Sequence, residues 1–143
     1  MRKNIVLMAG ILFMFVLSLQ MAAPASAAKL KVVDHGSVKF KDPSGNGTDT
    51  FTWKTYQKGA NYVEMVGYLY LPKYNVGAHT YLYLQKVSKN KIKMYAKETA
   101  KNYNTGKTFK QNLGTSYYKT KLTAAQCYWK FARSAFIKGI TGG

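Results

Sequence analysis

The feature that most constrains the fold is an alternation of apolar residues with tyrosine and lysine across residues 62–97. Successive side chains of a β-strand point to opposite faces, so such a period of two predicts strands with one apolar face. In residues 62–71, Val63, Met65, Leu69 and Leu71 share one face. Val66 is the apolar exception on the other face, among tyrosines and a glutamate.

A second strand follows the turn-like residues 72–77, and there the phase of the alternation reverses. Leu82 and Leu84 take the apolar face, so an antiparallel hairpin brings all four leucines of the two strands together. The register that we expect pairs Leu69 with Leu82, and two tyrosine pairs follow from it across the strands: Tyr70 with Tyr81, and Tyr68 with Tyr83.

A third strand continues the pattern in residues 91–97, with Ile92, Met94 and Ala96 on the apolar side. Tyrosine offers a large contact area at low entropic cost, and lysine supplies charge for phosphate or carboxylate groups. We therefore expect a ligand-binding face, with the alternative that these rings pack under a loop or under the C-terminal segment. Its predicted members are Tyr68, Tyr70, Tyr81, Tyr83, Lys91, Lys93, Tyr95 and Lys97.

Shorter alternating segments and turns surround these strands. Residues 37–41 and 50–56 alternate, residues 42–47 are dense in turn residues, and residues 58–61, 88–90 and 102–106 read as connections. The sequence predicts a mainly β fold, either a small antiparallel sandwich or a partly open barrel. We expect one β-rich domain over residues 28–143.

Residues 123–138 have two interpretations. Thr123 and Gln126 have the spacing of a capping box, and a helix would then place Tyr128, Phe131, Ala132, Ala135 and Phe136 in one stripe and stop at Gly139. A long strand is the alternative, because residues 125–131 also alternate. As an amphipathic helix, the segment is a second candidate surface, for contact with a membrane. Its candidate residues are Trp129, Lys130, Arg133 and Lys138, unless the helix packs on the core.

The N-terminus has the pattern of a secretory signal peptide. Arg2 and Lys3 precede an apolar run, and small residues around Ala27 form a cleavage site. We expect residues 1–27 to be removed and the protein to be secreted into the extracellular space.

Charge is the strongest global feature. The chain has 22 basic residues, of which Arg2 and Lys3 belong to the predicted signal peptide, so 20 remain against five acidic ones, a net charge of +15. A field of this size attracts polyanions. The partners that we expect outside a cell are an anionic cell-wall polymer, an acidic polysaccharide or a membrane surface, and the signal peptide argues against nucleic acid.

The sequence predicts neither an enzyme nor a cofactor. Asp34, His35 and Ser37 are types used in catalysis, but alternation turns neighbours on an extended segment to opposite faces. Residues 42–49 resemble half a calcium loop, yet Trp53 stands where the bidentate glutamate belongs, so a hairpin turn explains them and no metal site is predicted. Cys127 is the sole cysteine, so it is either buried or pairs between chains.

Two functions follow from these patterns. The first is a small secreted cationic protein that binds anionic cell-envelope material, with an antimicrobial or bacteriocin-like role as one form of it. The alternative is an extracellular structural or matrix protein that self-associates through sheet edges or aromatic faces. The sequence leaves the ligand and the oligomeric state open.

Overall fold

The computed structural model describes residues 30–45 and 47–142, so the predicted signal peptide lies outside the described residues. The strands are β1 (Leu30–Lys41), β2 (Thr48–Lys58), β3 (Tyr62–Leu71), β4 (Val76–Ser88), β5 (Lys91–Asn102) and β6 (Thr108–Lys119). A 3-10 turn, η2 (Pro72–Tyr74), joins β3 to β4. The C-terminal helix has three parts, namely α3 (Ala124–Cys127), the π-helical turn η3 (Tyr128–Ala132) and α4 (Arg133–Thr141).

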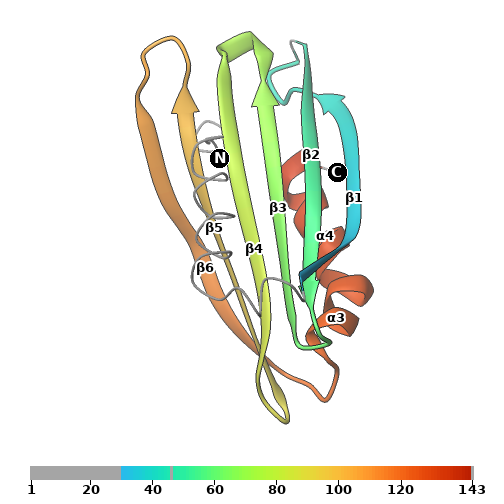
Figure 1. Cartoon of the computed structure of the whole chain (residues 1–143). Coiled ribbons are helices and arrows are strands. Elements are labelled where there is room, and N and C mark those ends of the chain that lie inside the picture. The colour runs from blue at the N-terminus through green and yellow to red at the C-terminus, as the bar shows by residue number, and fades with distance from the viewer. Residues whose placement is uncertain (1–29, 46, 143) are drawn as a thin grey trace.

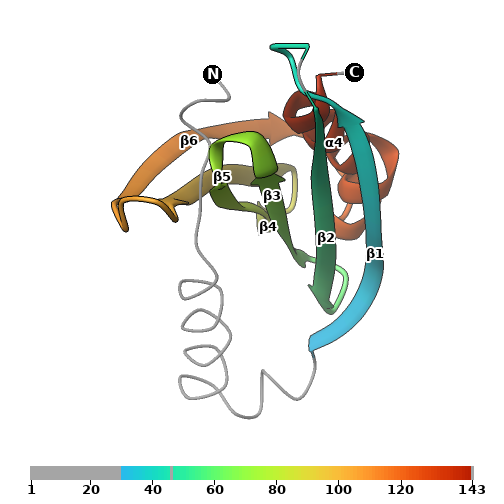
Figure 2. The same cartoon turned by 90° about the horizontal axis from the view of Figure 1, so that it is seen from above.

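The six strands form one antiparallel sheet in which each strand pairs with its neighbours in sequence. The expectation of a mainly β fold is confirmed. The sheet curls around the C-terminal helix, which lies on its concave side (Figures 1 and 2). Edge strands β1 and β6 do not pair with each other, so the sheet stays open. The strands therefore make a single curled layer and not the two layers of a sandwich.

The core lies between the concave face and the helix. Met65, Leu69 and Leu84 from the central strands pack with Cys127 and Tyr128 of the helix, and all are buried. This face is the apolar face that the alternation predicts, and burying it provides most of the favourable free energy of folding. The helix contributes to the same cluster through residues one turn apart, Ala124, Tyr128 and Ala132.

The expected register between β3 and β4 is wrong, although the faces are right. Leu69 pairs with Ala78, and Leu82 pairs with Met65. The turn is shorter than residues 72–77, because Leu71 already pairs with Val76 and Asn75 adopts a left-handed conformation with φ of 50°. The pairing shifts by an even number of residues, so every side chain keeps its face.

The helical alternative for residues 123–138 is correct. Thr123 Oγ1 accepts a hydrogen bond from Gln126 N at 3.1 Å, and Gln126 Oε1 accepts one from Thr123 N at 2.9 Å. These two bonds complete the predicted capping box. The helix is preceded by the end of β6 and a short connection, so no strand continues past Lys119.

The predicted apolar stripe and stop of this helix need correction. Tyr128 and Ala132 are buried and Phe136 is half-buried, but Phe131 and Ala135 are exposed. The wide turn of η3 changes the angular spacing of the side chains, so the stripe does not follow a regular 3.6-residue period. The helix also runs past Gly139 and ends where Gly142, with φ of 81°, donates its N–H to Lys138 O at 2.8 Å.

Candidate binding face

All eight residues predicted for the ligand-binding face lie on the convex side of the sheet, opposite the helix. Strand alternation places Tyr68 and Tyr70 of β3, Tyr81 and Tyr83 of β4, and Tyr95 of β5 there. Lys91 and Lys93 of β5 continue the same face toward the β4–β5 turn, and Lys97 lies on this face on the other side of Tyr95. We call this set the tyrosine–lysine face. Its members are therefore brought together, although the tyrosines do not pair as expected.

Five tyrosines and His79 form a continuous aromatic row across β3, β4 and β5. The alternation of β4 places His79 on this face too, and its ring lies between those of Tyr68 and Tyr81. The separations of successive ring centroids are 6.4 Å for Tyr70–Tyr68, 4.7 Å for Tyr68–His79, 6.5 Å for His79–Tyr81, 6.3 Å for Tyr81–Tyr83 and 4.5 Å for Tyr83–Tyr95.

The centre of this row is buried. Tyr81 and Tyr83 have exposed fractions of 1% and 3%, whereas Tyr68, Tyr70 and Tyr95 are half-buried. Burial raises the pKa of both central hydroxyls, so they stay protonated at neutral pH. The outer tyrosines thus offer more of their surface to a ligand than Tyr81 and Tyr83 do.

Two lysines of β5 lie over the rings of the row. Lys97 Nζ is 5.6 Å from the ring centroid of Tyr81 and 5.7 Å from that of Tyr83, and Lys93 Nζ is 5.2 Å from that of Tyr95. A cation over an aromatic face is attracted by the ring quadrupole. Lys93 and Lys97 are half-buried residues, so each combines a contact with the rings and positive charge at the surface.

Glu64 is the acidic residue of this face. Tyr62 OH donates a hydrogen bond to Glu64 Oε1 at 2.6 Å. Burial raises the pKa of Glu64 to about 7, although the bond from Tyr62 and the charge of Lys97 act in the opposite direction. The alternation of β3 placed Glu64 here, but only the tertiary structure shows that its carboxyl group is buried.

Some hydroxyl groups of the outer tyrosines have partners within the protein. Tyr68 OH lies 3.1 Å from Tyr103 OH, and Tyr70 OH donates to Asn75 Oδ1 at 3.1 Å. Tyr103 comes from the β5–β6 turn and reaches β3 only through the tertiary fold. Side-chain hydrogen bonds thus fix the rings of Tyr68 and Tyr70 in place before any ligand binds.

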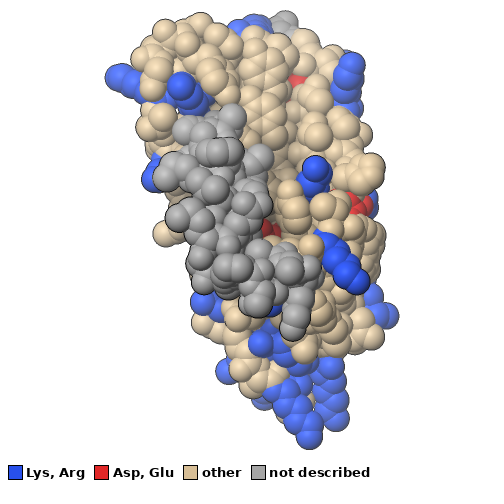
Figure 3. All heavy atoms as spheres, viewed as in Figure 1, with Lys and Arg blue, Asp and Glu red and all other residues tan. Residues whose placement is uncertain are grey.

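Positive charge is unevenly distributed over the molecule. From residue 99 to the end, the chain has seven lysines and Arg133 and no acidic residue. Basic side chains gather at the lower end in Figure 3, at the end of the sheet that holds the β4–β5 turn. Asp42 and Asp49 lie at the other end, beside the β1–β2 turn.

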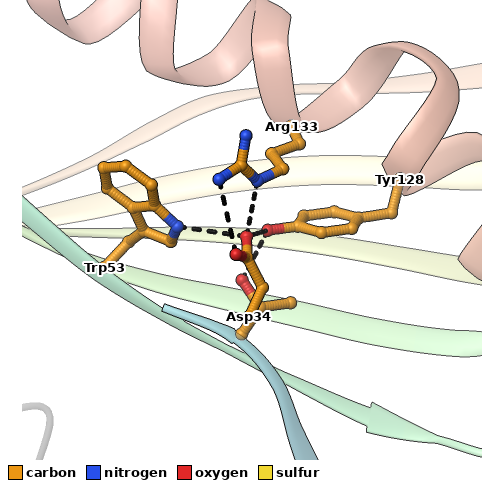
Figure 4. Close-up of polar contacts among 5 residues, drawn as sticks. Asp34, Trp53, Tyr128 and Arg133 are labelled. Atoms are coloured by element: carbon orange, nitrogen blue, oxygen red, sulfur yellow. Dashed lines mark hydrogen bonds and ion pairs between the residues drawn. The ribbon is translucent and has the colours of Figure 1, made fainter. Parts of the chain in front are cut away.

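Of the four candidates for membrane contact on the helix, Arg133 has a different role. Its Nε donates to Asp34 Oδ2 at 2.6 Å, and its Nη2 lies 3.4 Å from Asp34 Oδ1 (Figure 4). The guanidinium carbon lies 5.3 Å from the ring centroid of Trp53 and 5.6 Å from that of Trp129. Arg133 therefore fastens the helix to β1 and β2.

Asp34 accepts from two further donors, Tyr128 OH at 2.6 Å and Trp53 Nε1 at 3.1 Å (Figure 4). Tyr128 OH is also 2.6 Å from Thr55 Oγ1. Burial alone would raise the pKa of Asp34, but the hydrogen bonds from Arg133, Tyr128 and Trp53 outweigh it and hold the pKa below its usual value. We call Asp34, Trp53, Tyr128 and Arg133 the Asp34 clamp. Asp34 and Arg133 lie about 100 residues apart in the chain, so no local sequence pattern links them.

The remaining residue types of chemical interest are dispersed. Alternation turns His35 outward to solvent and Asp34 toward the helix, and Ser37 Oγ lies 3.3 Å from Thr52 Oγ1. Cys127 is on the buried side of the helix, so an accessible thiol for pairing between chains is contradicted. Within residues 30–45 and 47–142, no three of the histidine, cysteine and acidic side chains form a group able to hold a metal ion.

Trp129, Lys130 and Lys138 are exposed on the helix. Over the described part of the chain, the structure has no helix with the length and apolar character needed to cross a bilayer.

Comparisons with protein-family models, with curated proteins and with solved structures find no match to the chain.

Proposed function

We propose that the chain is a small cationic binding protein that associates with anionic cell-envelope material. The observation that carries this proposal is the segregation of charge. The C-terminal 45 residues include eight basic side chains and no acidic one, and they form the end of β5, β6, the helix and the turns between them. A one-sign surface of this kind attracts polyanions and accelerates their encounter with the protein.

The acidic residues do little to offset this charge at the surface. Asp34 is neutralised by Arg133, and the carboxyl group of Glu64 is buried with a pKa of about 7. Exposed lysines such as Lys91, Lys119 and Lys130 are free to contact an external anion. The half-buried ring of Tyr95 adds aromatic contact area on the face that carries Lys91.

Retention on isolated cell walls and on vesicles tests the proposal. The protein is expressed with its own N-terminal segment and purified from the compartment in which it accumulates. It is then mixed with walls, with phosphatidylglycerol vesicles and with phosphatidylcholine vesicles at about 0.05 and 0.5 M salt. We expect retention on an anionic target at low salt, loss at high salt, and none on phosphatidylcholine. Absence of retention on both walls and anionic vesicles would overturn the proposal.

A second candidate function is self-association as an extracellular structural protein, and the open sheet favours it. Edge strands β1 and β6 both leave one side of their backbone unpaired within the sheet, and Phe109 and Leu113 of β6 are exposed. The buried Cys127 takes no part in such an assembly. Sedimentation over a wide concentration range separates the two functions, because a monomer at all concentrations removes this one.

A further inference from the structure

Three chain segments meet at the lower end of the sheet and make it strongly basic. The segments are the end of β4 with the start of β5, the end of β6, and residues 120–122 that lead to the helix. Lys91 pairs with Lys119 across β5 and β6, and Thr120 N donates to Asn90 O at 2.9 Å. Residues 85–93 and 117–123 contain six lysines and no acidic residue. We call this region the basic end.

Lys86 fixes the connection to the helix at this end. Its Nζ donates to Thr120 O at 3.1 Å and to Leu122 O at 2.5 Å. With this ammonium group engaged, the exposed charges of the basic end are those of Lys89, Lys91, Lys119 and Lys121. The backbone around them is held by ladder hydrogen bonds and by Lys86, so the positions from which these side chains extend are fixed.

Large apolar side chains are exposed among these lysines. Val87 lies where the β4–β5 register shifts, between Lys86 and Ser88, and it is 44% exposed. Tyr117 of β6 is 58% exposed, and Lys91 Nζ lies 5.8 Å from its ring centroid. Tyr118 and Phe131 are also exposed and meet edge to face at 5.7 Å. At a membrane interface, lysines can contact the charged headgroups while apolar and aromatic side chains contact the start of the acyl chains. The mixture of side chains at the basic end matches these two layers.

We propose that the basic end docks on an anionic lipid surface, with lysines contacting lipid phosphates and Val87 and Tyr117 inserting at the headgroup level. This inference rests on the proposed function and narrows the anionic target to the phosphate groups of lipids. A wall polymer needs no exposed valine at the contact, whereas a bilayer gains from burying it. A second copy of the chain does not fit this end, because its like-charged lysines would repel.

Matched variants test the site by cosedimentation with phosphatidylglycerol–phosphatidylcholine vesicles at low salt. The first variant removes three charges from the basic end: Lys89→Gln, Lys119→Gln and Lys121→Gln. Its control removes three exposed charges near the opposite end: Lys73→Gln, Lys107→Gln and Lys110→Gln. Net charge is the same in both. We expect the first to lose affinity on the order of 100-fold, from about fivefold per lysine near the surface, and the control to lose much less.

A second pair of variants tests insertion. Val87→Ser with Tyr117→Ser removes apolar surface at the basic end, and Phe109→Ser with Leu113→Ser removes similar exposed groups farther along β6. We expect about a tenfold loss of vesicle affinity for the first pair and little change for the second. Circular dichroism and thermal unfolding of each variant verify that it keeps the fold, and only folded variants enter the comparison.

The outcomes separate this inference from the proposed function. Equal losses from the two lysine variants would show general charge attraction and overturn the basic end as the site. Unchanged binding after Val87→Ser with Tyr117→Ser would overturn the insertion. Retention on cell walls without binding to anionic vesicles would overturn the lipid target and leave the proposed function intact. Failure on both targets would remove the proposed function as well.

Discussion

At the scale of single residues, the Asp34 clamp shows how one side chain joins distant parts of the chain. The Asp34 carboxylate accepts from β2 and from the helix while it sits on β1. Hydrogen bonds to a buried charged group contribute more to stability than neutral ones, and an unmatched charge left behind is costly. The clamp therefore fixes the helix against the edge of the sheet at which β1 lies.

Replacing Asp34 by Asn should lower the free energy of unfolding by about 2 kcal/mol at pH 7, since it weakens a charge-assisted network. The pKa of Asp34 is below its usual 3.8 in the folded protein, so the stabilisation is present above that value and is lost as pH falls through the lower folded pKa. Urea unfolding of wild type and Asp34→Asn at pH 7 and near pH 3 measures both effects. A double-mutant cycle with Arg133→Gln isolates the pair, and additive losses would contradict it.

Glu64 gives the opposite pH dependence. The folded carboxyl group holds its proton up to about pH 7, whereas the unfolded one releases it near 4.5. Between these values the folded state binds more protons, so stability falls as pH rises. Glu64→Gln should remove this fall, and its stability relative to wild type should rise by on the order of 2 kcal/mol from pH 5 to pH 8. If thermal unfolding gave the same difference in stability between the two proteins at pH 5 and at pH 8, the carboxyl group would not be buried.

At the scale of elements, the close packing of the central strands depends on a glycine. Gly67 of β3 faces the core, and a Cβ built on it would lie 2.4 Å from Phe51 Cζ and 2.8 Å from Thr80 Oγ1. Residue 67 therefore has to lack a side chain for β2, β3 and β4 to pack at this spacing. The helix differs, since a Cβ on Gly139 meets no atom within 4 Å.

Two glycine substitutions with opposite signs follow. Gly67→Ala should lower the free energy of unfolding by about 2 kcal/mol, because the added methyl group overpacks a buried site. Gly139→Ala is its control and should raise the free energy by up to about 1 kcal/mol through helix propensity. Denaturant unfolding of both variants provides the comparison, and a neutral Gly67→Ala would refute the packing of Phe51 on β3.

The sequence predicted the central strands and their faces, because strand alternation is local, but it did not predict β6 and left residues 123–138 open between a helix and a strand. Leu69, Leu82 and Ile92 lie in the core as the alternation requires. The β3–β4 register was not predictable from this pattern, since an even shift leaves the faces unchanged and the left-handed conformation of Asn75 decides the turn. The clamp was missed because Asp34 and Arg133 are distant in the chain, and burial of Tyr81 depends on tertiary packing.

At the scale of the whole molecule, the fold separates charge. One curled sheet holds a buried core on its concave side and an aromatic row on its convex side, while lysines collect at the basic end (Figure 3). The net charge of +15 over residues 28–143 is therefore unevenly distributed over the surface of the molecule. Attraction of an anionic surface to such a molecule depends on ionic strength, because exposed charges are screened by salt.

The dependence of binding on salt tests this account most directly. The association constant of the protein for anionic envelope material, walls or phosphatidylglycerol vesicles, is measured from about 0.05 to 0.5 M sodium chloride. The account predicts a steady fall over that range for the target that binds, with a smaller slope for the variant lacking Lys89, Lys119 and Lys121. An association constant that does not change with salt would contradict it.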